Sequence, residues 1–245
     1  MENLGYYNGK FGPIEDMVIP MNDRVCWFGD GVYDAGPARN YNIFALDDHL
    51  DRFYNSARLT GIQIPMPREE LAELLRDLVK KVEAPEHFVY YQCTRGSAPR
   101  KHDYVEAPGN LWVTITPQTM PDGTKRIKLR SEPDTRFYHC NIKTLNLMPA
   151  VMSSQAAKRE GVFETVYYRE NMGNRVTECA HSNVSMILND ELWTAPLDEL
   201  ILPGIARKHL IAAAKRLGIG VHEEPFDLDT LRGAQEIIVT SSSNL

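Results

Sequence analysis

The sequence contains no long apolar run and few cysteines. No apolar stretch approaches the roughly 20 residues that a membrane-spanning helix needs. The N-terminus, residues 1–6, lacks the basic and apolar segments of a signal peptide. The four cysteines are widely scattered and form no CxxC pair, which favours reduced thiols over a disulfide framework or a zinc site. We therefore expect a cytoplasmic protein that binds no metal.

Basic segments are absent as well. Lys+Arg 27 against Asp+Glu 33 gives a formal net charge of −6, and no block of basic residues argues for a nucleic-acid partner. Neither a G-x-G-x-x-G nor a Walker sequence is present, so we do not expect a nucleotide as the ligand of a phosphate site. The content of 43% hydrophobic residues in 245 positions is ordinary for a globular protein with one large domain or two small ones.

Apolar periodicity and turn residues predict an α+β fold of two domains. Asn8-Gly9 indicates a hairpin, and Asp47-Asp48 is predicted to cap a helix that Gly61 ends. Turn residues at 118–124 predict a linker between a first domain, 1–117, and a second, 125–245, with a ligand site in the cleft between them. Further helices are predicted at 68–82, 148–160 and 205–217, and strands at 31–38, 43–46, 87–94, 111–116, 127–130, 164–168, 184–188, 192–194 and 236–240.

One lysine differs from the others in its surroundings. Lys143 lies among apolar residues just before the helical pattern at 148–160. A lone lysine in a loop usually faces solvent, because an ammonium is costly to bury. A lysine held in an apolar site is instead a usable amine nucleophile, able to form a Schiff base. Three further segments favour this second interpretation.

Two of these segments offer groups for a phosphorylated heterocycle. Glu178 is the carboxylate in a run of small polar residues, and a buried carboxylate can hold a ring nitrogen protonated. Leu202-Pro203-Gly204 opens a helix whose first backbone N–H groups suit an anion. The hydroxyls at 240–243 and the guanidinium of Arg52 can add to such a phosphate site. Each alone fits an ordinary polar turn or helix start as well.

The third segment is an extended loop that contains proline. Arg100 and His102 lie two residues apart on it, and an arginine fork matches a carboxylate. An exposed basic turn is the alternative interpretation. A lysine nucleophile, a carboxylate for a ring nitrogen and several phosphate ligands are together what pyridoxal phosphate requires.

The chain also resembles the class IV, fold-type IV pyridoxal-phosphate aminotransferases, and within them the D-amino acid aminotransferases most closely. The similar segments keep the same order and spacing from near residue 6 to the end of the chain. They are Phe28-Gly29-Asp30-Gly31-Val32-Tyr33, His49-Leu50-Asp51-Arg52, Thr94-Arg95-Gly96, Pro99-Arg100-Lys101-His102, Ile142-Lys143-Thr144-Leu145-Asn146, Thr177-Glu178, Ser182-Asn183-Val184, Ile201-Leu202-Pro203-Gly204-Ile205 and Val239-Thr240-Ser241.

The resemblance implies a homodimeric enzyme that transfers the amino group of a D-amino acid, such as D-alanine, to a 2-oxo acid. It implies that Lys143 holds pyridoxal 5′-phosphate and later moves the substrate proton, and that Glu178 pairs with the pyridine nitrogen. The other cofactor residues that it implies are Arg52, Arg136, His181, Ser182, Ile205, Ala206, Ser241 and Ser242. It also implies that the substrate carboxylate is bound by Tyr33, Arg100 and His102, the last two from a neighbouring subunit.

The chain departs from the family's pattern at three points. Ala206 stands where the family often has threonine, and His181 where D-amino acid aminotransferases usually have serine. The chain ends at Leu245, so we expect the second domain to be incomplete. Three alternatives stay open: a branched-chain L-amino acid aminotransferase, against which the Pro-Arg-x-His loop argues, an aminodeoxychorismate lyase, and a non-catalytic protein that binds a phosphate metabolite.

Overall fold

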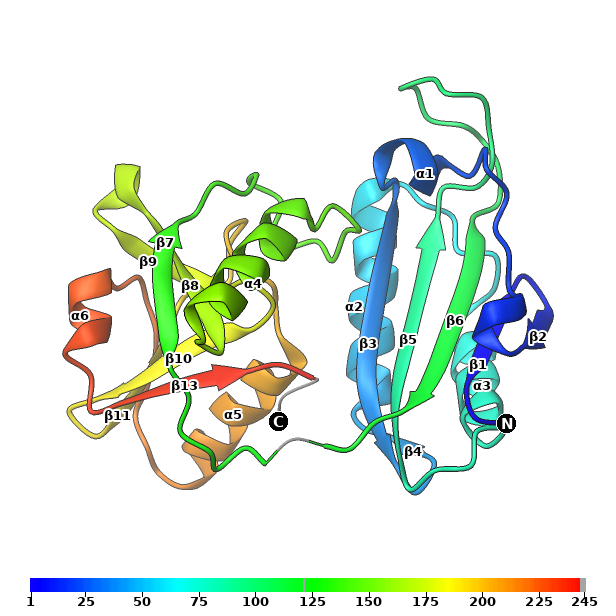
Figure 1. The fold of residues 1–245 in the computed structure, drawn as a ribbon. Helices are drawn as coiled ribbons and strands as arrows, with labels where there is room; N and C mark the ends of the chain where they lie inside the picture. The colour runs from blue at the N-terminus through cyan, green and yellow to red at the C-terminus, as the bar shows by residue number, and fades with distance from the viewer. Residues whose placement is uncertain (121, 243–245) are drawn as a thin grey trace. The chain divides into compact units, whose positions relative to one another are not determined.

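The computed structural model describes residues 1–120 and 122–242. Helices and strands are mixed throughout this part of the chain (Figure 1), so the predicted α+β class is confirmed. The chain forms two compact units, a first of Met1–Pro121 with Ile142–Asn146, and a second of Asp122–Asn141 with Leu147–Leu245. The boundaries given above for the domains stay a prediction, but the segment that carries Lys143 belongs to the first unit.

The first unit is built on a six-stranded sheet in the order β2-β1-β6-β5-β3-β4, with all neighbours antiparallel. The predicted hairpin is confirmed, since Asn8 and Gly9 have positive φ angles of 45° and 93°. The strands are β1 (Leu4–Tyr7), β2 (Lys10–Gly12), β3 (Gly31–Arg39), β4 (Asn42–Ile43), β5 (Glu86–Thr94) and β6 (Asn110–Pro117).

Two helices, α2 (Leu46–Thr60) and α3 (Arg68–Val79), cover one face of this sheet (Figure 1). Alternate residues of β5 and β6, such as Val89 and Val113, are fully buried against Leu50 and Phe53 of α2 and Leu75 of α3. Burying each such side chain contributes about 1.5–3 kcal/mol. A 3-10 turn, η1 (Ile14–Asp16), and a short helix, α1 (Arg24–Phe28), precede β3.

The start of α2 differs from the prediction. Its N-cap is Ala45, at a φ of 45° and without a capping side chain, so the prediction that Asp47 and Asp48 cap the helix is wrong. Both carboxylates lie in the first turn, where they interact favourably with the helix dipole. The end is as predicted, because Gly61 takes the left-handed conformation at a φ of 66°.

The second unit contains a four-stranded sheet, β12-β11-β10-β13, and a three-stranded sheet, β7-β8-β9. Helix α5 (Ile205–Arg216) packs on one face of the four-stranded sheet through Ile211, and residues such as Met186 on its other face join a core with Val166 and Val176 of the smaller sheet. The strands are β7 (Leu129–Pro133), β8 (Glu164–Arg169), β9 (Arg175–Cys179), β10 (Asn183–Leu188), β11 (Glu191–Thr194), β12 (Val221–Glu223) and β13 (Glu236–Thr240).

Helix α4 (Met148–Glu160) also lies in this unit, with η2 (Glu170–Met172) and α6 (Leu228–Arg232). The predicted helices at 148–160 and 205–217 are confirmed within one residue. The predicted strand at 43–46 is wrong beyond Ile43, because residues 44–45 form a turn and α2 begins at Leu46. Elements α1, β9, β12 and α6 were not predicted from the sequence, because they are short or rich in polar residues. No helix of the described residues is long and apolar enough to cross a membrane.

One helix offers two leucines in opposite environments, which tests the proposed core. Leu50 of α2 is fully buried, whereas Leu59 is 43% exposed. We expect Leu50→Ala to lower the free energy of unfolding by about 2–5 kcal/mol, because it removes packed methyl groups and leaves a cavity. Leu59→Ala should cost less than about 1 kcal/mol. Urea denaturation followed by circular dichroism measures both, and equal costs would contradict this core.

Candidate active site

Lys143 lies in a short irregular segment beside β3. Its carbonyl oxygen accepts a hydrogen bond from the backbone N–H of Tyr33 at 3.0 Å, and its own N–H donates to Ser56 Oγ at 3.2 Å. The side chain is half-buried, and Nζ lies 4.3 Å from the centroid of the Tyr33 ring. The backbone of the lysine is therefore fixed, and its amine lies against an aromatic face.

Arg52 of α2 is held by Asp34 of β3. Its Nε and Nη2 donate to the two carboxylate oxygens at 2.8 Å each, and Nδ1 of His49 lies 2.7 Å from Oδ1. All three side chains are buried. Burial alone would raise the pKa of Asp34, but the Arg52 guanidinium and the hydrogen bond from His49 lower it well below its usual range. Asp34 is thus ionised and orients the guanidinium.

Glu178, on β9, is a buried carboxylate with donors on both oxygens. Arg136 Nη1 donates to Oε1 at 2.7 Å, while Asn183 Nδ2 and the backbone N–H of Leu202 donate to Oε2 at 2.9 and 3.0 Å. Arg136 also donates through Nε and Nη2 to Asp134. Burial would lower the pKa of Arg136, but the two carboxylates raise it. Such donors favour the ionised form of Glu178.

The start of α5 is fixed to this carboxylate. Asn183 Nδ2, besides its bond to Glu178, donates to the carbonyl of Leu202 at 3.0 Å. Gly204 is the N-cap, no side chain caps the helix, and no acidic residue lies in its first turn. A Cβ on Gly204 would lie 1.9 Å from Asn183 Oδ1, so only glycine fits. The buried residues Ile205 and Ala206 therefore begin a helix whose N-terminus suits an anion.

A second buried carboxylate, Glu164 of β8, holds the segment that follows β9. It accepts hydrogen bonds from the backbone N–H of His181 at 2.6 Å and from Ser182 Oγ at 2.9 Å. The His181 imidazole is 46% exposed, with Nδ1 3.3 Å from Oε1. Burial raises the pKa of Glu164, although His181 and these hydrogen bonds oppose the shift. Glu164 was not predicted as a site residue, because the sequence shows only one acidic residue at the start of an apolar strand.

The remaining predicted residues fall into two groups. Ser241 and Ser242 follow β13 and are half-buried, and Ser243 lies outside the described residues. Arg100 and His102 are exposed on the loop after β5, and both contact the ring of Phe28, at 5.2 Å from Arg100 Cζ and 5.0 Å between ring centroids for His102. In the described part of the chain, the Lys143 amine thus lies against the Tyr33 ring, whereas Arg100 and His102 contact the Phe28 ring.

Comparison with known proteins adds to this geometry. The family model described as amino-transferase class IV matches residues 31–245. The chain belongs to this family. A D-alanine aminotransferase from Listeria monocytogenes is 37% identical over 235 residues, which are 94% of this chain and 80% of the relative. The resemblance stated from the sequence is therefore confirmed, and the protein is an aminotransferase.

Solved structures show the same fold at lower identity. The branched-chain amino acid aminotransferase from Escherichia coli has a TM-score of 0.87 at 19% identity, over 99% of this chain and 83% of that one. The branched-chain aminotransferase from the archaeon Thermoproteus uzoniensis, solved with norvaline, has a TM-score of 0.86 at 20% identity, over 98% and 84%. Both likenesses concern the fold alone.

Removing the charge of Asp34 should destabilise the first unit. Asp34→Asn leaves buried Arg52 without its counter-charge, so we expect the free energy of unfolding to fall by about 3–5 kcal/mol. Asp51→Asn is the matched control. It breaks the ion pair with Arg68, in which the Asp51 side chain is 66% exposed, and it should cost less than about 1 kcal/mol. Urea denaturation at neutral pH measures both, and equal costs would contradict the assigned role of Asp34.

The same pair predicts a pH dependence. The pKa of Asp34 is lower in the folded chain than its unfolded value of about 3.9. Its stabilising contribution is therefore complete above that value and is lost as the pH falls further. The difference between wild type and Asp34→Asn should shrink below about pH 4.

A methyl group on Gly204 should disturb the Glu178 site. Gly204→Ala displaces the Asn183 amide, and with it the hydrogen bonds to Glu178 and Leu202. Leaving such buried groups unpaired costs about 1–3 kcal/mol each, so the melting temperature should fall. Gly233→Ala is the matched control, because Gly233 has an ordinary φ of −84° and no atom closer than 3.6 Å to the added methyl group. A melting temperature unchanged in Gly204→Ala would contradict the described packing.

Proposed function

We propose that this aminotransferase uses pyridoxal 5′-phosphate to transfer the amino group of a D-amino acid, D-alanine among them, to a 2-oxo acid. It works as a cytoplasmic homodimer. The observation that carries the proposal is the pairing of Glu178 with the start of α5, through Asn183 and Leu202. The preference for D-amino acids is supported by the 37% identity to a D-alanine aminotransferase.

The donor set fits the chemistry of this cofactor. A pyridine nitrogen needs a carboxylate that stays ionised, and Glu178 has donors that favour that form. A phosphate needs a helix N-terminus without competing acids, and α5 provides one. An aldehyde needs an amine, for which Lys143 is available. When bound, the cofactor supplies an electron sink for the charge that develops at the substrate Cα.

The residues then have separate tasks. Lys143 would attach the cofactor. Its amine would take the proton from the Cα of the amino donor and, in the second half-reaction, deliver a proton to the Cα of the product amino acid. Glu178 would hold a proton on the ring nitrogen, and Arg136 would contact the phenolic oxygen. The phosphate would be bound by Arg52, by the backbone N–H groups of Ile205 and Ala206, and by the hydroxyls of Ser241 and Ser242.

Other proposed residues act around these groups. His181 and Ser182 line the cofactor site from the segment that Glu164 holds. The substrate carboxylate is bound by Tyr33, and by Arg100 and His102 from the partner subunit. An arginine fork binds a carboxylate through two parallel hydrogen bonds, which gives direction as well as affinity.

A panel of D- and L-amino donors with a 2-oxo acid acceptor tests the proposal. Formation of the new oxo acid should be faster from D-alanine than from L-alanine or L-leucine. Lys143→Ala should lose about 10³-fold or more of this rate, because it removes the amine that attaches the cofactor and moves the proton. Lys158→Ala, at an exposed position of α4, is the matched control and should keep the rate.

The outcomes separate the rival functions. Faster turnover of L-leucine would favour a branched-chain enzyme. Release of pyruvate from aminodeoxychorismate, without any amino acceptor, would favour the lyase. Borohydride treatment should fix a pyridoxyl group on the peptide that contains Lys143. Labelling at another lysine would overturn the proposed site.

A further inference from the structure

The loop that connects β5 to β6, residues 95–109, is irregular, and Arg100 and His102 are exposed on it. Long charged side chains on such a loop occupy many conformations in solution. Fixing them around a carboxylate costs conformational entropy, which lowers affinity unless the protein orders them beforehand. The contacts of this loop therefore bear on how well it binds a substrate.

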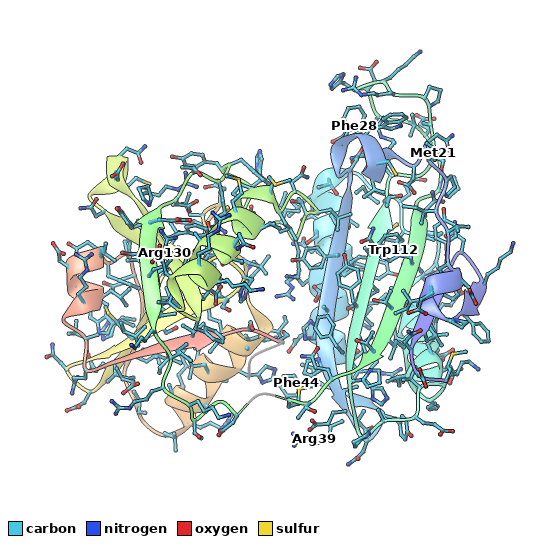
Figure 2. The ribbon with its side chains drawn as sticks, in the orientation of Figure 1. Met21, Phe28, Arg39, Phe44, Trp112 and Arg130 are labelled. Atoms are coloured by element: carbon cyan, nitrogen blue, oxygen red, sulfur yellow. The ribbon has the colours of Figure 1, made fainter. Side chains whose placement is uncertain are left out.

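Phe28 lies at the end of α1 (Figure 2). Its ring contacts both basic residues. Arg100 Cζ lies 5.2 Å from the ring centroid, and the His102 ring centroid lies 5.0 Å away at an interplanar angle of 48°. Cation–π and aromatic contacts of this kind favour one arrangement of each side chain over the others. One aromatic ring therefore orders both members of the Arg-x-His pair.

Arg24, one turn earlier on α1, holds the backbone between these two residues. It is 2% exposed, its Nε donates to Asp30 Oδ2 at 2.7 Å, and its Nη1 donates to the carbonyl of Lys101 at 2.7 Å. Its Cζ lies 5.0 Å from the Phe28 ring centroid. Asp30 is itself fixed by buried Arg95, whose Nε lies 2.9 Å from Oδ2. The carbonyl of Lys101 is thus bound by an arginine that is itself part of the Arg24–Asp30–Arg95 ion-pair network.

The first part of the loop is also fixed to the segment around α1. The backbone N–H of Arg24 donates to the carbonyl of Gly96, and that of Ala98 donates to the carbonyl of Asn22, both at 2.9 Å. The stretch Arg100–His102 follows directly, and Arg24 and Phe28 contact it through their side chains. These two side chains therefore control the conformation of the Arg100–His102 stretch.

We propose that Arg24 and Phe28 are positioning residues that hold Arg100 and His102 in the arrangement that binds the substrate carboxylate. The inference rests on the proposed function of Arg100 and His102. Neither positioning residue touches the substrate. Arg24 acts through the carbonyl of Lys101, and Phe28 acts through the two basic side chains.

The first test measures the loop itself and needs no substrate. Trypsin cleaves after Arg100 and Lys101 only when the loop opens, so the cleavage rate reports how firmly it is held. Phe28→Leu keeps an apolar side chain but removes the ring, and we expect cleavage there about tenfold faster. Phe28→Tyr keeps the ring and should restore the wild-type rate. Trp27→Leu, at the adjacent position that is 43% exposed, is the matched control.

The second test measures substrate binding. Phe28→Leu and Arg24→Lys should each raise KM for D-alanine about tenfold, with kcat changed far less, since only the carboxylate contact weakens. The inhibition constant of propionate, which has a carboxylate but no amine, should rise in parallel. In the Arg100→Met background, Phe28→Leu should raise KM by less than it does in the wild type, because only His102 is then left for the ring to position.

The outcomes separate this inference from the proposed function. If Arg100→Met leaves KM for D-alanine unchanged, the carboxylate trap itself is wrong. If Arg100→Met raises KM but neither Phe28→Leu nor Arg24→Lys does, the trap stands and the positioning role is wrong. If Phe28→Leu does not fold, Arg24→Lys decides alone. A rise in KM with a parallel fall in melting temperature that Phe28→Tyr does not reverse would show a merely structural role.

Discussion

A buried arginine must be paired with a carboxylate, and this constraint determines where the proposed site residues lie. An unpaired buried guanidinium would be very costly, and three aspartates of the described chain are each shared by two basic side chains. The three sets are Asp34 with Arg52 and His49, Asp30 with Arg24 and Arg95, and Asp134 with Arg136 and Arg169. One carboxylate cannot satisfy all donors of two basic groups. The remaining donors therefore point to further acceptors, such as Glu178 for Arg136 and the carbonyl of Lys101 for Arg24.

In the second unit a single neutral amide, that of Asn183, holds two groups together in a similar way. Asn183 donates to Glu178 and to the carbonyl of Leu202, so the carboxylate on β9 and the turn before α5 keep a fixed separation. The close approach of the amide excludes any side chain at Gly204. A cofactor with a ring nitrogen at one end and a phosphate at the other requires such a fixed separation, and loops alone would not maintain it.

Helices and strands that a local sequence pattern marks were predicted correctly. Contacts between residues far apart in the sequence were not predicted. The predicted bounds of β13 and α4 agree with the structure, because apolar periodicity and flanking turn residues mark both. Strand β9 was missed because its polar residues, Glu178 among them, are buried by partners elsewhere in the chain. Lys143 and Glu178 were proposed as site residues from their residue types and from the resemblance, and their roles stay a prediction. The bond between Glu178 and Arg136 joins positions 42 residues apart, and no local pattern marks it.

One short stretch, Phe28–Tyr33, connects several of these features. Gly29 ends α1 in the left-handed conformation at a φ of 61°. Asp30 fixes the arginine that holds the loop after β5, and Phe28 contacts that loop directly. A Cβ on Gly31 would lie 2.5 Å from the Leu145 side chain and 3.0 Å from the carbonyl oxygen of Cys93, so a larger residue would displace this leucine of the lysine segment. The backbone of Tyr33 then donates to the carbonyl of Lys143, and its ring lies under the amine. Within the first unit, Lys143 and the loop that carries Arg100 and His102 thus depend on the same short stretch, and a substitution in it disturbs both.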